Sequence, residues 1–159
     1  MEDWRQDRVG AAERGENPMV LTRMRRGFAV IGDHQFIPGY CLLIASPRAN
    51  HLSDLSFEAR GDYLLDMSVL GEAVAAVCQP RRVNYEILGN ADPFLHAHVW
   101  PRYEWEPDEY RRGSVWRYPR EQRYAKEHEY AEDRHGEVRA RIAAALTTLM
   151  TERGITLPK

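Results

Sequence analysis

The stretch FLHAHVW, residues 94–100, is the part of the sequence that decides the fold. Successive side chains of a β-strand project to opposite faces, so this stretch, as a strand, sorts into two rows. The apolar row is formed by Leu95, Ala97 and Val99. This row can face a core, and it leaves the imidazoles of His96 and His98 side by side on the opposite face.

Two neighbouring imidazoles are compatible with three kinds of site. They can bind a metal, divide the work of nucleophile and acid, or fill a polar surface. The spacing alone does not choose among these, although no third metal ligand follows at a diagnostic distance in the sequence. We therefore expect no metal at His96 and His98, and the rest of the sequence has to supply the context.

Short apolar runs with turn residues between them predict further strands. They lie at 28–31, 40–45 and 83–88, and glycine, proline, asparagine and aspartate separate them from their neighbours in the chain. The segment 88–93, just before the histidines, is rich in small and polar residues, which suit a loop that approaches a ligand closely.

Two helices complete the expected fold. Within 53–80, apolar residues recur with the spacing of one helix face, and 137–150 repeats that pattern. We expect an α+β fold in which both helices flank an antiparallel sheet. The domain should span 28–159, preceded by an N-terminal arm or helix at 1–27 that is charged and only partly ordered.

The composition and charge limit the classes of partner that the protein can bind. A chain of 159 residues suits one domain, and its formal charge of -2 provides no field for holding a nucleic acid. Cys41 and Cys78 lie among apolar neighbours and are expected to be reduced core thiols. The N-terminus lacks a signal-peptide pattern, and no stretch approaches the roughly 20 apolar residues of a membrane span. We therefore expect a cytoplasmic protein with no membrane partner.

The segments NYEILGN at 84–90 and FLHAHVWPRY at 94–103 together resemble the signature of the histidine triad (HIT) family. That signature is three alternating histidines on a strand, closed by two apolar residues and often Pro-Arg. The segments at 28–44 and 51–55 resemble the first strand pair of the family and its lead into the long helix, so the similarity covers 28–103. The resemblance implies a HIT-like antiparallel sheet of about five strands with one long helix and a C-terminal helix.

The resemblance also implies roles for the histidines. Alignment on the Pro-Arg pair places the middle histidine of the family at His96 and the third at His98, while Phe94 occupies the first position. In the family the middle histidine attacks an α-phosphorus and carries the nucleotidyl group, and the third binds phosphate. A backbone carbonyl at the first position holds the other nitrogen of the nucleophile, and Phe94 retains a carbonyl.

Four further residues are candidates for substrate binding by the same resemblance. Asn90 falls where relatives present a polar side chain to the phosphates, and Asp33 lies next to the ribose-contacting position. His51 matches a position that is often basic, and Arg102 could hold a phosphate through two hydrogen bonds. The alternatives are a turn asparagine, an exposed histidine before the helix, and an arginine in a structural ion pair.

The expected function is therefore that of a nucleotide hydrolase or transferase that acts at an α-phosphate through a nucleotidyl-histidine intermediate. Dinucleoside polyphosphates, as in the diadenosine polyphosphate hydrolases, and nucleoside phosphoramidates are the substrate classes that the resemblance implies. No cofactor is required by this chemistry, and a homodimer is expected. The alternative is a nucleotide-binding or regulatory module with little turnover, because Phe94 leaves the triad incomplete. The aromatic stretch 103–118 could stack a base or pack within the protein, and it receives no assignment.

Overall fold

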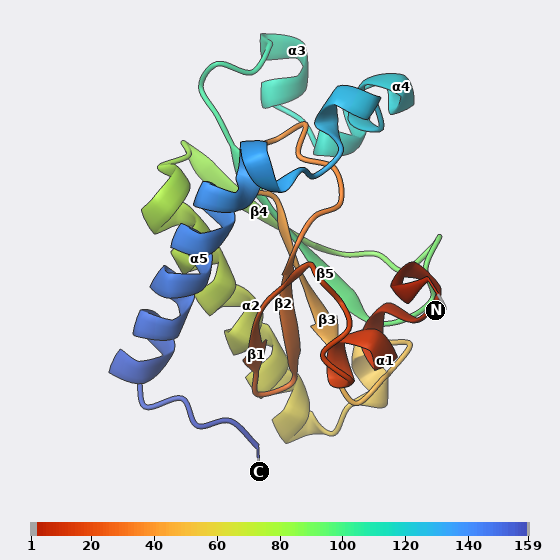
Figure 1. Cartoon of the computed structure of the whole chain (residues 1–159), viewed down its shortest axis with the longest axis vertical. Helices are drawn as coiled ribbons and strands as arrows, with labels where there is room; N and C mark the ends of the chain where they lie inside the picture. Colours follow the sequence, from red (N-terminus) through yellow and green to blue (C-terminus); the bar gives the residue numbers. More distant parts are fainter. Residues whose placement is uncertain (1–2, 159) are drawn as a thin grey trace.

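The computed structural model describes residues 3–158 and has a five-stranded antiparallel sheet at its centre. The spatial order of the strands is β1-β2-β3-β5-β4 (Figure 1). Their bounds are β1 Val20–Met24, β2 Gly27–Ile31, β3 Cys41–Ala45, β4 Arg82–Ile87 and β5 His96–Arg102. The predicted α+β fold with a sheet of about five strands is thus confirmed.

The helices fall into two long elements and several short ones. The α-helices are α1 Arg8–Glu13, α2 Phe57–Cys78, α3 Asp108–Arg111, α4 Arg120–Arg123 and α5 Glu132–Glu152. The 3-10 helices are η1 Trp4–Asp7, η2 Leu52–Asp54, η3 Val115–Arg117 and η4 Lys126–His128. None of the helices within 3–158 has the length and apolar character to cross a bilayer.

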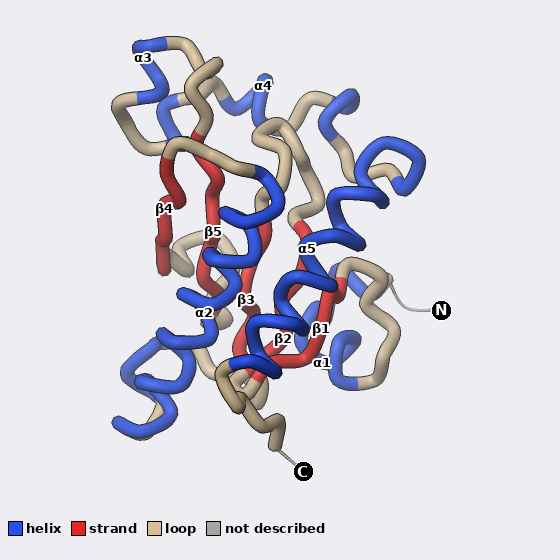
Figure 2. The backbone as a smooth tube through the Cα atoms, turned by 90° about the vertical axis from the view of Figure 1, so that its left-hand side faces the viewer, coloured by secondary structure: helices blue, strands red, loops and turns tan. Residues whose placement is uncertain are grey.

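The long helices α2 and α5 cover one face of the sheet, as Figure 2 shows. The Ser56 side chain accepts a hydrogen bond from Ala59 N and caps the start of α2, and Gln79 ends the helix in the left-handed conformation at φ 48°. The apolar row of β5 lies in the core beneath these helices, with Ala97 and Val99 fully buried. The predicted sorting of β5 into two rows is confirmed, and His96 and His98 are left on the other face.

The sheet extends further toward the N-terminus than the sequence suggested. β1 lies within the segment predicted as an arm, and it pairs with β2 through partners such as Arg23 and Phe28. This edge strand is irregular between Val20 and Thr22, and it carries a charged residue where a regular alternation would place an apolar one. Its pattern is therefore weak in the sequence, although the sheet needs it.

Several element boundaries also differ from the predictions, among them that of the long helix, which was expected over 53–80 and is Phe57–Cys78. β5 begins at His96, because Leu95 still accepts a hydrogen bond from Ala45 N of β3 but donates its own N–H to Ala49 O, outside the sheet. The C-terminal helix begins at Glu132, several residues before the predicted start at 137.

Cys41 and Cys78 are free thiols, as predicted, and burial raises the pKa of both.

The chain between β5 and α5, residues 103–131, holds α3, η3, α4 and η4 at one end of the sheet (Figure 1). We call it the β5–α5 connection. Its inner residues form an apolar cluster with the sheet: Phe36, Ile37, Tyr40, Trp100, Val115 and Tyr118. This cluster places the β5–α5 connection next to the face that carries the two histidines.

Candidate active site

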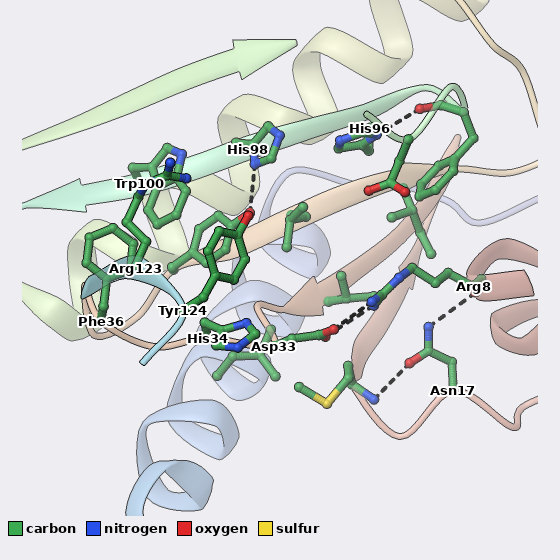
Figure 3. A pocket seen from close by; sticks show the side chains of 18 of the residues that line it. Arg8, Asn17, Asp33, His34, Phe36, His96, His98, Trp100, Arg123 and Tyr124 are labelled. Carbon is green, nitrogen blue, oxygen red and sulfur yellow. Dashed lines mark hydrogen bonds and ion pairs between the residues drawn. The ribbon is translucent and has the colours of Figure 1, made fainter. Parts of the chain in front are cut away.

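His96 and His98 stand next to each other on β5, with ring centroids 4.9 Å apart. They are only 7% and 8% exposed and line a cavity of about 270 Å³ on the face of the sheet opposite α2 and α5. Figure 3 shows them in the middle of the cavity, with Arg8 and Asn17 toward one end and Trp100, Phe36 and Arg123 toward the other.

The Nδ1 atom of His96 lies 2.7 Å from the carbonyl oxygen of Phe94. A carbonyl oxygen only accepts hydrogen bonds, so Nδ1 carries the proton and donates. The electron pair of the neutral ring is then on Nε2. The backbone at Phe94 thus fixes the tautomer that a nucleophilic imidazole needs, while the Phe94 ring packs against the ring of His96 with centroids 4.8 Å apart.

His98 is held through the same ring nitrogen by a different group. Its Nδ1 lies 2.7 Å from the hydroxyl of Tyr40, the residue just before β3, the strand that pairs with β5. Burial raises the pKa of the Tyr40 phenol well above its ordinary value, so the hydroxyl keeps its proton. We infer that Tyr40 donates to Nδ1, which places the proton of His98 on Nε2.

The charge of His98 follows from its surroundings. Burial, and to a smaller extent the neighbouring His96, lower the pKa of His98 from 6.5 to about 4. The ring is therefore neutral at pH 7. With these tautomers the two rings present different groups to the cavity: an electron pair on His96 Nε2 and an N–H on His98 Nε2.

At one end of the cavity Arg8 and Asp33 form an ion pair, which places one positive and one negative charge in the lining. The two nitrogen–oxygen distances are 2.6 and 3.2 Å, so the contact is bidentate. Asn17 donates to Arg8 O and accepts from Met19 N, which ties α1 to this wall. Asp33 lies where the sequence predicted a binding residue. Arg8 and Asn17 belong to the predicted arm, and no sequence pattern pointed to them.

At the other end the wall is aromatic. Trp100 stacks on Tyr40 with ring centroids 3.4 Å apart, and Trp116 meets His98 edge-on at 5.5 Å. Arg123 and Tyr124 line the same end. Three of these residues come from the β5–α5 connection. The aromatic stretch at 103–118 was the one available signal for this wall, and it did not reach Arg123 or Tyr124.

Phe94 also lines the cavity, whereas the structure does not bring Asn90, His51 or Arg102 to it. Asn90 is exposed, and the residue of its loop that lines the cavity is Asp92. His51 is exposed at the start of η2, where its backbone N–H donates to Asp54.

Arg102 forms a structural ion pair, which was the alternative to phosphate binding in the sequence analysis. It is 2% exposed and donates to both carboxylate oxygens of Glu106 at 2.8 to 3.1 Å. It also donates to the carbonyls of Tyr110 and Gly113, at 2.9 and 2.7 Å. Burial raises the pKa of Glu106, but the hydrogen bonds from Arg102, Tyr103 N and Tyr118 outweigh it and lower the pKa below its ordinary value. Arg102 therefore fastens the β5–α5 connection to the strand that carries the histidines.

No cluster of three or more histidine, cysteine, aspartate or glutamate side chains that could hold a metal occurs within residues 3–158. The lining itself presents two imidazoles, the tyrosine behind one of them, and charged and aromatic groups at the two ends.

Solved structures of histidine triad proteins share this fold. A histidine triad protein from Marinobacter aquaeolei is 23% identical, with a TM-score of 0.68 over 82% of this chain and 89% of its own. One from Sinorhizobium meliloti is 18% identical, with a TM-score of 0.69 over 91% and 96%. A hypothetical histidine triad nucleotide-binding protein from Sulfolobus tokodaii is 12% identical, with a TM-score of 0.69 over 95% and 98%.

No protein-family model and no curated protein sequence matches the chain. At these identities the structural similarity shows the fold alone, and that fold is the one found in histidine triad proteins.

Proposed function

We propose that the protein is a nucleotide hydrolase or transferase that acts at the α-phosphate of a nucleoside phosphate through a nucleotidyl-His96 intermediate. The observation that carries this proposal is the pair of hydrogen bonds at Nδ1 of the two histidines. Together they leave an electron pair on His96 Nε2 and a proton on His98 Nε2, within one cavity. A phosphoryl centre needs both a nucleophile for phosphorus and a donor for its oxygens.

The first half of the proposed reaction forms the intermediate. The electron pair of His96 Nε2 forms the N–P bond while the bond from phosphorus to the leaving group breaks, and the electron pair of the broken bond departs with the leaving group. An amine leaving group also takes up a proton from solvent and departs neutral. His98 Nε2–H donates to a non-bridging oxygen and stabilises its charge. The ring of His96 becomes cationic, and the carbonyl of Phe94, 2.7 Å from Nδ1, stabilises that charge.

The second half releases the product. Water attacks the same phosphorus and gives up a proton to solvent, and the N–P bond breaks with its electron pair returning to His96 Nε2. A nucleoside monophosphate leaves, and His96 returns to its neutral form. Another acceptor in place of water gives a transferase. Asp33 and Asn17 at the Arg8 end of the cavity are suited to the hydroxyls of the nucleoside, because they offer oxygen acceptors beside the histidines.

The assembly that we propose is a homodimer. β4 is an edge strand of the sheet, and Tyr85 and Leu88 are exposed on or beside it at 42% and 48%. Leu65 of α2 is exposed at 56%. An open edge with apolar side chains is a surface that proteins usually cover. Sedimentation at micromolar concentration should give twice the chain mass of 18.5 kDa, and a strictly monomeric chain would remove this part of the proposal.

The experiment that tests the function is single-turnover hydrolysis of α-labelled diadenosine triphosphate and of adenosine 5′-phosphoramidate. Wild-type protein should carry acid-labile label during turnover. The His96→Ala variant should lose label and roughly a thousandfold or more of the rate, since it lacks the nucleophile. His51→Ala, which changes an exposed histidine outside the cavity, is the matched control and should keep both.

The same experiment separates the second candidate, a nucleotide-binding module. Phe94 at the first position of the triad favours that candidate, because the site lacks one histidine side chain. Tight binding of the nucleotide with neither label nor turnover would support the module, and unchanged turnover in His96→Ala would overturn the enzyme mechanism.

A further inference from the structure

Two arginines line the cavity, and they differ in their charge balance. Arg8 is neutralised by its bidentate contact with Asp33. Arg123 forms no ion pair with any aspartate or glutamate of residues 3–158, and its hydrogen bond runs from Nε to the carbonyl of Tyr118, at 3.2 Å. Its two terminal nitrogens have no hydrogen-bond partner in the part of the chain that is described. Arg123 is thus the cavity arginine that no carboxylate of residues 3–158 contacts, whereas the second carboxylate of the lining, Asp92, acts on Arg8.

The guanidinium of Arg123 is held in place by aromatic rings. Its central carbon lies 4.9 Å from the ring centroid of Trp116 and 5.4 Å from that of Tyr124. Trp116 is itself fixed, because its indole N–H donates to Glu86 at 2.7 Å. A planar guanidinium that is already oriented loses little entropy when it binds the oxygens of a phosphate.

Arg123 also lies on the correct side of the histidines for a group that leaves. The ring of Trp116, on which it stacks, meets His98 at 5.5 Å. Figure 3 shows Arg123 at the end of the cavity away from Arg8 and Asn17. A substrate whose nucleoside occupies the Arg8 end and whose α-phosphate reaches the histidines would extend its remaining part toward Arg123.

We propose that Arg123 binds the phosphate next to the one attacked, and so selects substrates whose leaving group is itself a phosphate over those whose leaving group is an amine. This inference rests on the proposed function. When the bond between the α-phosphorus and the bridging oxygen breaks, the electron pair and negative charge go to the terminal oxygen of the departing phosphate. Arg123 neutralises that charge, whereas a departing neutral amine gains nothing from it.

The test compares two substrates that share the adenylyl group. Diadenosine triphosphate releases ADP, and adenosine 5′-phosphoramidate releases ammonia. Arg123→Gln should lower kcat/KM for diadenosine triphosphate roughly 10- to 100-fold and leave the phosphoramidate within about twofold. Arg123→Lys should fall between wild type and Arg123→Gln, because it keeps the charge without the planar fork.

Arg120→Gln is the matched control. Arg120 lies on the same short helix and contacts the ring of Tyr124 at 5.1 Å, but it does not line the cavity. The Arg120→Gln variant should therefore leave kcat/KM unchanged for both substrates. The inference would be overturned if Arg123→Gln lowered kcat/KM equally for both substrates, or if Arg120→Gln lowered kcat/KM for diadenosine triphosphate as much as Arg123→Gln does. Either result would leave the nucleotidyl-histidine mechanism intact.

A binding measurement tests Arg123 without any turnover. A methylene-bridged diadenosine triphosphate and AMP are titrated into wild-type and Arg123→Gln protein by calorimetry. The variant should bind the bridged analogue about tenfold more weakly and AMP with unchanged affinity. Equal changes for both ligands, or no change for either, would overturn the inference even if the wild-type protein proves to have no catalytic activity.

Discussion

The two regions that form the cavity are built in different ways. The histidine face of the sheet is fixed by the backbone: β3 and β5 pair in register from Cys41 with Val99 to Ile44 with His96, and the Phe94 carbonyl orients one ring. The β5–α5 connection is held by side chains near its start, and by backbone hydrogen bonds only near its end, where Gln35 N donates to His128 O and Tyr130 N to Asp33 O. Its short helices are held to the sheet by Arg102 with Glu106 and by Trp116 with Glu86.

This difference separates two properties of the proposed enzyme. Groups on the histidine face touch the phosphorus that every substrate presents, so changes there should affect all substrates alike. Groups on the β5–α5 connection touch what differs between substrates, and changes there should alter selectivity. The three predictions that follow, from the largest expected effect to the smallest, test that separation.

The largest effect is expected at the ion pair that holds the β5–α5 connection. Arg102→Met should lower the free energy of unfolding by about 4 kcal/mol, because the Glu106 carboxylate stays buried without its cation. Urea unfolding measures this. Arg123→Met removes an arginine of the same region that pairs with no carboxylate of residues 3–158, and it should cost less than about 1 kcal/mol. Similar losses in the two variants would show that Arg102 is not the fastening point.

The double variant Arg102→Met with Glu106→Gln supplies the control. Replacing the carboxylate by a neutral amide removes the buried charge, so part of the lost stability should return. If the double variant is as unstable as the two single losses added together, the ion pair is not the cause.

The next effect is a dependence of stability on pH that arises at the histidine face. Because the pKa of His98 is about 4 in the folded protein and 6.5 when the ring is unperturbed, the unfolded chain binds a proton more readily than the folded one. This contribution is complete above pH 6.5 and is lost as the pH falls toward 4. It amounts to about 3 kcal/mol.

Urea unfolding between pH 7 and pH 4 checks this for wild-type and His98→Gln protein. The carboxylates titrate in both proteins, so the difference between the two slopes isolates His98. Wild type should lose more stability than the variant over this range. Parallel slopes would mean that His98 is not a buried neutral ring.

The smallest effect concerns the hydroxyl behind His98. Tyr40→Phe keeps a ring to stack on Trp100 but removes the donor to Nδ1, so both tautomers of His98 become populated. We expect kcat to fall about tenfold with little change in KM, and by the same factor for diadenosine triphosphate and the phosphoramidate. A loss confined to one substrate would assign Tyr40 to selectivity and break the separation of the two regions.

The sequence predicted the histidine face well because a strand with one buried face has a period of two. The row of Leu95, Ala97 and Val99 can only turn inward, and the histidines then share the other face. Asp33 was placed at the site by resemblance, and it lies in the cavity. The edge strand β1 was not predicted, since one side of it has no neighbouring strand and its alternation is irregular.

The two ends of the cavity could not be predicted from the sequence. Arg8 and Arg123 lie on helices of six and four residues, which carry no periodic signal of their own. Whether an arginine there pairs with a carboxylate or lines the cavity without one depends on contacts between distant segments, such as that of Arg8 with Asp33. Arg102 shows the reverse: its position in the Pro-Arg pair suggested phosphate binding, and its actual partner, Glu106, comes from the turn that follows.

The hydrogen bond at Phe94 has a consequence for how proteins of this kind are recognised. The group that orients His96 is a main-chain carbonyl, which every amino acid contributes, so natural selection acts on the side chain at position 94 only through packing and substrate contact. A motif that demands three histidines would reject such a sequence, although a backbone carbonyl holds the ring of its proposed nucleophile. The geometry of the histidine strand is a better criterion for grouping such proteins than the three-histidine sequence motif.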